Sequence, residues 1–171
     1  HQPKRDVMSE HHMQRLGPDA AGIAAAAEML RRDGVVSFPT ETVYGLGAHA
    51  CSDPAVARIY AAKGRPQFNP LIAHVLDQAM ARTLCHFNKT AMTLADAFWP
   101  GALTLVLPLK DDAGVSKLVT AGLTTLAVRA PDHPVAQALL QSCGGPIAAP
   151  SANPSGRVSP TTADHVVAGL G

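Results

Sequence analysis

The sequence has few aromatic residues and almost no excess charge of either sign. Phe, Trp and Tyr make up only 4% of its 171 residues, and 14 Lys and Arg stand against 13 Asp and Glu, a formal net charge of +1. This balance argues against a polybasic nucleic-acid clamp and against an acidic interaction tail. Because 47% of the residues are hydrophobic, the composition still predicts a globular domain with a core of small and aliphatic side chains.

Long apolar runs are also missing. A membrane-spanning helix needs about 18 consecutive apolar residues. The most apolar stretch, residues 23–30, contains Glu28 and is followed by two arginines. We therefore expect no membrane span and no membrane partner.

Cysteine and histidine occur without the spacings that bind metals. The three cysteines, Cys51, Cys85 and Cys143, are odd in number and form no C-x-x-C pair, and the eight histidines show no H-x-x-x-H or H-E-x-x-H pattern. Reduced thiols that pack as small hydrophobic side chains are favoured over a disulfide frame or a zinc site, and a metal site built by the protein is not expected. Reduced thiols indicate a cytoplasmic protein.

The length supports one domain. Residues 1–16 are polar, lack the apolar centre of a secretory signal and contain Met8 and Met13 as alternative initiators. We expect this segment to be a leader outside the core, and residues 17–171 to form the domain.

Helix and strand signals alternate along the chain. Helices are predicted from a cap at Asp19 to a left-handed stop at Gly34, from Ser52 or Asp53 to about residue 63, from Asp77 and from Asn88 to residue 98, from residues 132–134 to Gly144, and after Thr161. Strands are predicted at residues 35–38, 71–75, 103–107, 125–129 and 147–149. This order implies an α/β sheet with helices packed on it.

Three polar loops follow apolar elements, at residues 39–47, 63–70 and 150–160, where such folds place ligands. Residues 45–50 match G-x-G-x-x-A. The preceding strand ends too early for a dinucleotide fold, because it stops at Phe38 and the next helix is capped only at Ser52. A loop that lets a ligand approach the backbone and an ordinary tight turn both stay open for Gly45 and Gly47.

The second and third loops carry groups suited to phosphate. Lys63 and Arg65 lie two residues apart at a helix end, where one cation neutralises charge and the other binds two oxygens, although both also complement the helix dipole. Ser151 and Asn153 supply a hydroxyl and an amide after the last predicted strand, for phosphate or base contacts or for a local turn.

Two ionisable groups lie in predicted strands. Arg129 ends an apolar strand, so it needs an anion, which is either a carboxylate ligand or a protein acid such as Asp132. His74 is more often a hydrogen-bonded core histidine than a catalyst. Glu41 is the only acid near the loops in sequence. Positioning and charge neutralisation must therefore dominate, as in phosphoryl or nucleotidyl transfer.

Five motifs in one order carry a resemblance to a known family. They are FPTETVYGLG at 38–47, KGRP with NPL at 63–71, WPG with LT at 99–104, AVR at 127–129 and PSAN at 150–153. Across about residues 18–168 the chain resembles the YrdC-like threonylcarbamoyl-AMP synthases. The resemblance implies a YrdC/RibB-like α+β fold, with a twisted mixed sheet flanked by helices around a concave cationic cavity.

The resemblance also implies a reaction. L-threonine, bicarbonate and ATP would become threonylcarbamoyl-adenylate and pyrophosphate, a nucleotidyltransferase step in the biosynthesis of tRNA N6-threonylcarbamoyladenosine. The product would pass to the tRNA threonylcarbamoyl-transfer machinery. ATP and Mg²⁺, carried by ATP, would be the cofactors.

The family's site residues carry over by position. By resemblance, L-threonine would contact Thr42, His74, Arg129 and the backbone of Ala149. ATP would contact Lys63, Arg65, Asn69, Thr125, Ser151, Asn153 and Ser159, and the catalytic groups among these would be Lys63, Arg65, Ser151 and Asn153.

One departure and two alternatives accompany the resemblance. The family pattern continues with a Ser-Thr strand and an Arg-Pro-Gly segment, and the given sequence stops at Gly171 before either, so we expect the domain to be incomplete here. A non-catalytic module of the same fold that binds tRNA or double-stranded RNA is the main alternative. The carbamoyl-handling domain of hydrogenase maturation is less favoured, because the zinc-finger-like cysteines found with it are lacking.

Overall fold

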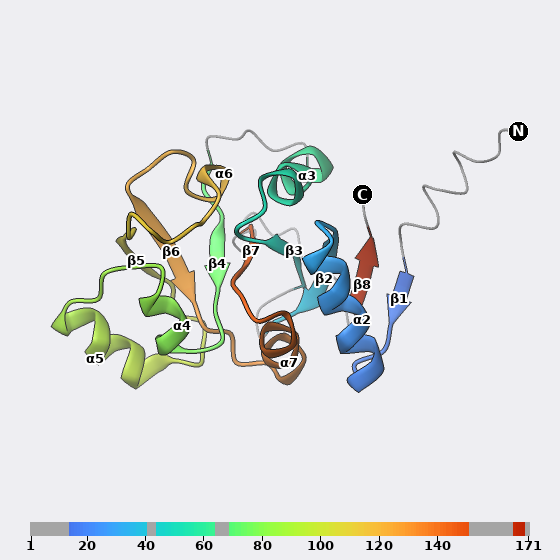
Figure 1. Ribbon diagram of the computed structural model, residues 1–171. Helices are drawn as coiled ribbons and strands as arrows, with labels where there is room; N and C mark the ends of the chain where they lie inside the picture. Colours follow the sequence, from blue (N-terminus) through green and yellow to red (C-terminus); the bar gives the residue numbers. More distant parts are fainter. Residues whose placement is uncertain (1–13, 41–43, 64–68, 151–165, 170–171) are drawn as a thin grey trace, which may run out of the picture.

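The computed structural model describes residues 14–40, 44–63, 69–150 and 166–169, with the backbone alone for residues 14, 15, 44, 63 and 166–169. The strands are β1 (Gln14–Leu16), β2 (Val35–Pro39), β3 (Tyr44–His49), β4 (Ile72–His74), β5 (Leu105–Pro108), β6 (Thr125–Arg129), β7 (Ile147–Ala149) and β8 (Val166–Gly169). In the described part of the chain they form one eight-stranded sheet in the order β1-β8-β2-β3-β7-β4-β6-β5 (Figure 1). The β4–β6 pair is parallel and the other neighbours are antiparallel.

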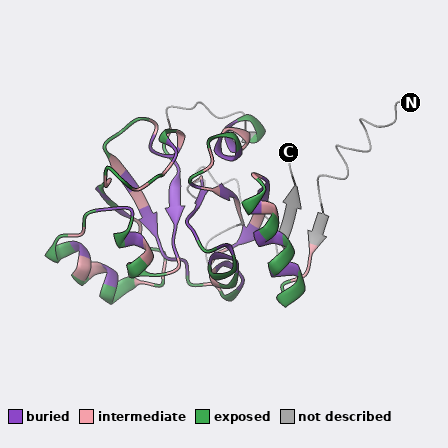
Figure 2. Ribbon diagram, in the orientation of Figure 1, coloured by how far each residue is buried: buried purple, intermediate pink, exposed green. Residues whose placement is uncertain are grey.

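Different helices cover the two faces of the sheet. They are α2 (Ala20–Arg31), α3 (Asp53–Lys63), α4 (Gln78–Arg82), α5 (Lys89–Phe98), α6 (Lys117–Thr120) and α7 (Pro134–Cys143). Helices α2 and α7 pack on one face, against Val36, Phe38, Ile147 and Ala149. Residues of α3, α4, α5 and α6 share the other buried cluster with Ala73, Val128 and Leu105. The buried sides of the helices therefore face the sheet, as Figure 2 shows. The expected fold class, a mixed sheet flanked by helices, is confirmed.

Helix α2 shows how local sequence sets an element. The Asp19 carboxylate accepts a hydrogen bond from the Gly22 amide at 2.9 Å, which caps the first turn. Ile23, Ala26, Ala27 and Leu30 then recur at helical spacing and are buried. These features confirm the helix predicted after Asp19.

The end of α2 differs from the prediction in one residue. The left-handed conformation belongs to Asp33, with φ of 65°, and not to Gly34. The Gly34 amide donates to the Met29 carbonyl at 2.8 Å and the Asp33 amide donates to the Leu30 carbonyl at 3.2 Å, the two bonds of a Schellman motif. Gly34 is needed for space instead, because a Cβ there would lie 2.6 Å from Met29 Cγ.

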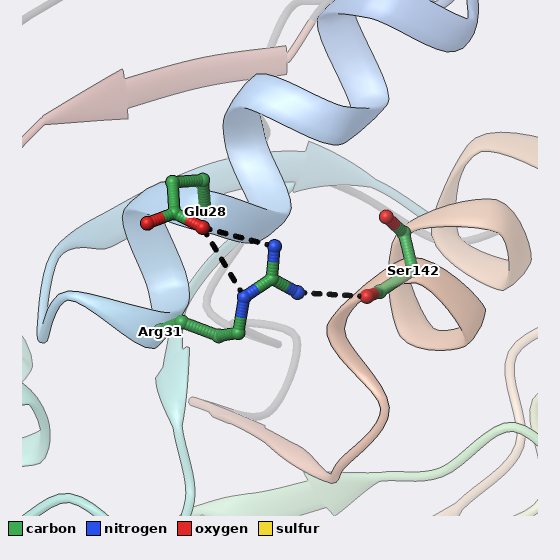
Figure 3. A network of polar contacts seen from close by, with 3 residues as sticks. All are labelled: Glu28, Arg31 and Ser142. Carbon is green, nitrogen blue, oxygen red and sulfur yellow. Dashed lines mark hydrogen bonds and ion pairs between the residues drawn. The ribbon is translucent and has the colours of Figure 1, made fainter.

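Helices α2 and α7 are also joined by a polar contact on the surface. Arg31 donates to the Ser142 carbonyl at 2.9 Å, near the end of α7, and forms an ion pair with Glu28 at 3.0 Å (Figure 3). The Arg31 and Glu28 side chains are 44% and 54% exposed, so the ion pair adds little stability. Its main effect is to align Arg31 with the carbonyl end of α7.

Several predicted elements are confirmed and others need correction. The strands at residues 35–38, 71–75, 103–107, 125–129 and 147–149 and the helices after Ser52, Asp77 and Asn88 are present within a few residues. Helix α7 is present too, and its N-cap is His133, within the predicted start at residues 132–134. Helix α6 and strands β1, β3 and β8 were not predicted. Residues 166–169 form a strand where a helix after Thr161 was expected; Thr161 itself lies outside the described residues.

The expected leader does not lie wholly outside the sheet. Gln14–Leu16 pairs with β8 in antiparallel register, so three residues before the expected boundary at residue 17 belong to the fold. Within the described residues, no helix has the length and apolar character required to cross a membrane. Cys85 and Cys143 are buried as expected, whereas Cys51 is exposed, and all three thiols are free.

The second half of the loop predicted at residues 39–47 belongs to strand β3, which begins at Tyr44. Gly45 and Gly47 lie in β3, opposite Phe38 and Val36 of β2, on the face that α2 and α7 cover. A Cβ at residue 47 would lie 2.6 Å from Ile147 Cγ2 and 2.7 Å from Phe38 Cε1, whereas a Cβ at residue 45 would find contacts of 3.6 Å. Gly47 is therefore a packing residue of the sheet, and the ligand-approach interpretation is wrong for it.

Gly47→Ala should destabilise the fold by about 1–3 kcal/mol, because the added methyl overpacks the space that Phe38 and Ile147 occupy. The matched control is Gly45→Ala, on the same strand and face, which should change stability by less than about 1 kcal/mol. Urea unfolding followed by circular dichroism measures both variants. Equal losses of stability would show that the two close contacts at residue 47 do not matter.

Candidate functional site

The predicted site residues divide into described and undescribed ones. Asn69, His74, Thr125, Arg129 and Ala149 are described with their side chains, and Lys63 ends α3 with its backbone alone described. The remaining predictions, Thr42, Arg65, Ser151, Asn153 and Ser159, lie outside the described residues.

Strands β4 and β6 bring His74 and Arg129 together. The two strands are parallel neighbours, and their register pairs His74 directly with Arg129. Paired residues of adjacent strands point to the same face of a sheet, so the imidazole and the guanidinium lie on one face although they are 55 positions apart in sequence. Both are buried, with exposed fractions of 4% and 5%.

Strand β7 pairs with the other edge of β4, so its residues also lie next to His74. Antiparallel pairing places Ile147 opposite His74 and Ala149 opposite Ile72, on the same face. The His74 Nδ1 lies 3.3 Å from the Ile147 carbonyl oxygen. Because a carbonyl only accepts, this bond requires the proton on Nδ1 and leaves Nε2 as the acceptor of a neutral ring. The prediction of a hydrogen-bonded core histidine is thus confirmed.

The protein keeps His74 neutral. Burial is the larger cause and the neighbouring Arg129 guanidinium the second, and together they lower the pKa of His74 from 6.5 to about 4, against the opposing effect of bonds to the Ile147 and Ile72 carbonyls. A neutral imidazole therefore stands beside a cation at neutral pH. His74 thus adds no second positive charge to this buried position.

Phe38 packs against His74 from three strands away. The two rings meet edge to face, with centroids 5.8 Å apart and planes at 89°. Strands β3 and β7 lie between them. On that face β3 presents Gly45 and Gly47, and β7 presents Ala149 and Ile147, so the two glycines leave the space that the Phe38 ring occupies. The glycine pattern of the first loop thus serves the site indirectly, by making room for the ring that holds His74.

Exposure rises from this buried pair toward the edge of the sheet. Thr125 and Ala127 lie on the same strand and face as Arg129 and are half-buried. Val106 of the edge strand β5 is paired with Ala127 and is 64% exposed. Since α2 and α7 pack on β2 and β7, the β5–β6 side of the same face is the accessible one, and the hydroxyl of Thr125 lies on it.

Asn69 is held by groups that the sequence reasoning missed. The Tyr60 hydroxyl lies 2.7 Å from the Asn69 carbonyl oxygen and 2.8 Å from the Leu118 carbonyl oxygen, and the Leu71 amide donates to the Val119 carbonyl at 2.9 Å. Tyr60 was predicted only as a helix residue. The available signal was a phenol three positions before Lys63 in the sequence.

Metal binding by protein side chains finds no support in the described part of the chain. No group of three or more His, Cys, Asp or Glu there is placed to hold an ion. The concave cationic cavity stays a prediction, since the residues expected to supply most of its charge lie outside the described ranges.

Comparison with known sequences gives a consistent result. Residues 28–171 match the family model Sua5_yciO_yrdC, described as "Telomere recombination". A threonylcarbamoyl-AMP synthase of Bacillus subtilis (strain 168) is 59% identical over 145 residues, which cover 84% of this chain and 42% of the relative. The chain thus spans less than half the length of that relative.

Solved structures agree with the sequence match. The structure described as P. abyssi Sua5 complexed with L-threonine is 48% identical, has a TM-score of 0.77 and covers 84% of this chain and 42% of that chain. E. coli YciO is 27% identical, with a TM-score of 0.69 and coverage of 78% and 65%.

The low pKa of His74 predicts a dependence of stability on pH. Between pH 6.5 and about 4 the unfolded chain binds a proton that the folded chain does not, so the free energy of unfolding falls as the pH falls through this range. From pH 7 to pH 5 the His74 contribution is a loss of about 2 kcal/mol. His74→Gln should remove the part of the pH dependence that His74 contributes. Urea unfolding at pH 7 and at pH 5 would measure the change in the free energy of unfolding. An unchanged pH slope would contradict a buried neutral His74.

Proposed function

The chain belongs to the Sua5/YciO/YrdC family, and from this premise we propose that it forms L-threonylcarbamoyladenylate and pyrophosphate from L-threonine, bicarbonate and ATP. The observation that carries the proposal is the buried pair of Arg129 and neutral His74, opposite each other on β4 and β6 at the positions where the family motifs expect an amino-acid site. The relatives named threonylcarbamoyl-AMP synthase support the activity.

Arg129 and His74 account for the amino-acid half. In the proposal the guanidinium binds the α-carboxylate of L-threonine, because a buried cation is stabilised strongly by a small anion. The His74 Nε2 then accepts a hydrogen bond from the ammonium or the hydroxyl of the substrate, since Nδ1 is committed to the Ile147 carbonyl. The Ala149 backbone and Thr42 complete the contacts. The solved relative that is described as complexed with L-threonine supports this choice.

The nucleotide half uses the remaining predicted residues. Lys63 and Arg65 would neutralise the triphosphate of ATP, which brings Mg²⁺ as part of the substrate. Asn69 and Thr125 would add polar contacts, as would Ser151, Asn153 and, with less support, Ser159. Thr125 lies on the same face of β6 as Arg129, four residues away, which corresponds to about 13 Å along a strand. That spacing leaves room for a nucleotide beside an amino acid on one sheet face.

The reaction then needs positioning more than acid–base chemistry. The threonine amine attacks bicarbonate to give a carbamate, with loss of water. A carbamate oxygen next attacks the α-phosphorus of ATP, the new P–O bond forms as the bond to the bridging oxygen breaks, and pyrophosphate leaves with the electron pair. Cations around the triphosphate stabilise the negative charge that develops. The product would be passed to the machinery that modifies tRNA.

The activity is tested by incubating the protein with ATP, bicarbonate and L-threonine and measuring pyrophosphate. We expect release that depends on threonine and bicarbonate. A full-length version that releases none, while binding tRNA or double-stranded RNA with a steep salt dependence and without ATP saturation, would favour the RNA-binding alternative instead.

Substitutions should separate the two halves of the site. Arg129→Ala should raise the threonine requirement at least tenfold, whereas Lys63→Ala and Arg65→Ala should weaken ATP binding, as measured by the KM for each substrate. These changes follow from loss of a charge-assisted contact in each half. Asp132→Asn, which removes a neighbouring acid, should leave both KM values unchanged. If it destabilised the protein as much as Arg129→Ala, a structural ion pair of Arg129 would be the better interpretation.

A further inference from the structure

Tyr60 connects three parts of the protein near the nucleotide half of the site. Its side chain is 2% exposed, and its hydroxyl reaches two carbonyl oxygens, that of Asn69 at 2.7 Å and that of Leu118 in α6 at 2.8 Å. A phenol has one proton, so the two carbonyls share it in a three-centre arrangement. The hydroxyl thereby fixes the backbone of Asn69 to both α3 and α6.

Helix α6 is itself anchored and so provides a firm reference. The Ser116 amide donates to the Ala50 carbonyl at 2.9 Å, just past β3, and the Ser116 hydroxyl accepts from the Leu118 amide at 3.2 Å. Val119 is fully buried, and its carbonyl accepts from the Leu71 amide at 2.9 Å. Residues 69 and 71, which lead into β4, are thus tied to α6 at two points.

The location of these bonds is what gives Tyr60 a role beyond packing. Tyr60 lies one helical turn before Lys63, and Asn69 is the first described residue after the cation-bearing motif. The residue that Tyr60 fixes is also one of the predicted nucleotide contacts. A shift of a few tenths of an ångström in the Asn69 backbone would be transmitted to its amide side chain, and polar contacts with a ligand are sensitive to such shifts.

We propose that the Tyr60 hydroxyl is a positioning group for nucleotide binding that acts through Asn69. This inference rests on the proposed function, because it assigns a role in ATP binding at the same site. Tyr60 contacts no substrate in this scheme. Its contribution is to hold Asn69 in the geometry that the nucleotide requires before the nucleotide arrives.

The test compares ligand affinities of four proteins: the wild-type chain, Tyr60→Phe, Asn69→Ala and the double variant. Isothermal titration with MgATP and, separately, with L-threonine gives each Kd. Tyr60→Phe should raise the Kd for ATP about threefold to tenfold, the effect of losing one hydrogen bond, and should change the Kd for threonine less than about twofold. In the Asn69→Ala background Tyr60→Phe should cause no further loss, because the two residues act as a unit.

Thr120→Val is the matched control. It removes another buried hydroxyl of the same region, one that bonds the Lys117 carbonyl at 3.3 Å and makes no contact with Asn69 among the bonds described. Thr120→Val should leave the Kd for ATP unchanged. The proposal is overturned if Thr120→Val raises the Kd for ATP as much as Tyr60→Phe does. It is also overturned if Tyr60→Phe raises the Kd values for ATP and threonine equally, or if the effects of Tyr60→Phe and Asn69→Ala on the Kd for ATP are additive.

A second measurement does not require a Tyr60 variant that folds. The sequence has only two tyrosines, so labelling with 3-fluorotyrosine gives two ¹⁹F resonances, which Tyr44→Phe assigns. MgATP should shift the Tyr60 resonance and L-threonine should not. A Tyr60 resonance that stays unmoved at saturating ATP overturns the inference.

The outcomes also separate this inference from the proposed function. A chain that binds ATP but releases no threonine-dependent pyrophosphate contradicts the proposed reaction, while the titrations still decide the role of Tyr60. A chain that releases pyrophosphate normally, with Tyr60→Phe indistinguishable from wild type, contradicts the positioning role alone. A wild-type chain that binds no ATP overturns both.

Discussion

The parallel pairing of β4 with β6 is the constraint on which the site depends. This pair alone is parallel among the strand pairs described, and its register sets a buried guanidinium beside a buried imidazole. Burial, and second to it the neighbouring guanidinium, lowers the pKa of His74 and keeps its ring uncharged. The register therefore fixes position and charge state together, and a one-residue slip would abolish both.

The packing on this face serves the same pair. Helices α2 and α7 seal the side of the face where Phe38 and Ile147 lie, and Phe38 extends over glycines to meet His74 edge to face. Helices α2 and α7 do not extend over β5 and β6. This face of the sheet is therefore buried near β2 and β7 and exposed at β5. On this face the exposed fraction is low at His74 and Arg129 and rises to 64% at Val106 on the edge strand β5.

Sequence features that act within one helix or strand predicted many of the elements. The features that they did not predict depend on pairing between distant segments. Caps at Asp19, Asp77 and Asn88 act within one helical turn and were recognisable in the sequence. Strand β3 was missed because its glycines favour a loop unless a partner such as Phe38 fills the space beside them. The importance of His74 and Arg129 followed from charge in apolar strands, but their adjacency depends on strand order, which periodicity does not encode. Tyr60 was missed because its partners are distant backbone carbonyls.

The position of β8 has a consequence for the order in which the molecule assembles. This strand is inserted between β1 and β2, so the first described strand pairs only with residues about 150 positions later. On the ribosome, Gln14–Leu16 must therefore wait until almost the entire given sequence has been synthesised before it can pair. Such long-range closure slows folding, because a large loop must be ordered first. Strands β2, β3, β7 and β4 can meet earlier, so the half of the sheet that carries His74 can form while the other edge is still incomplete.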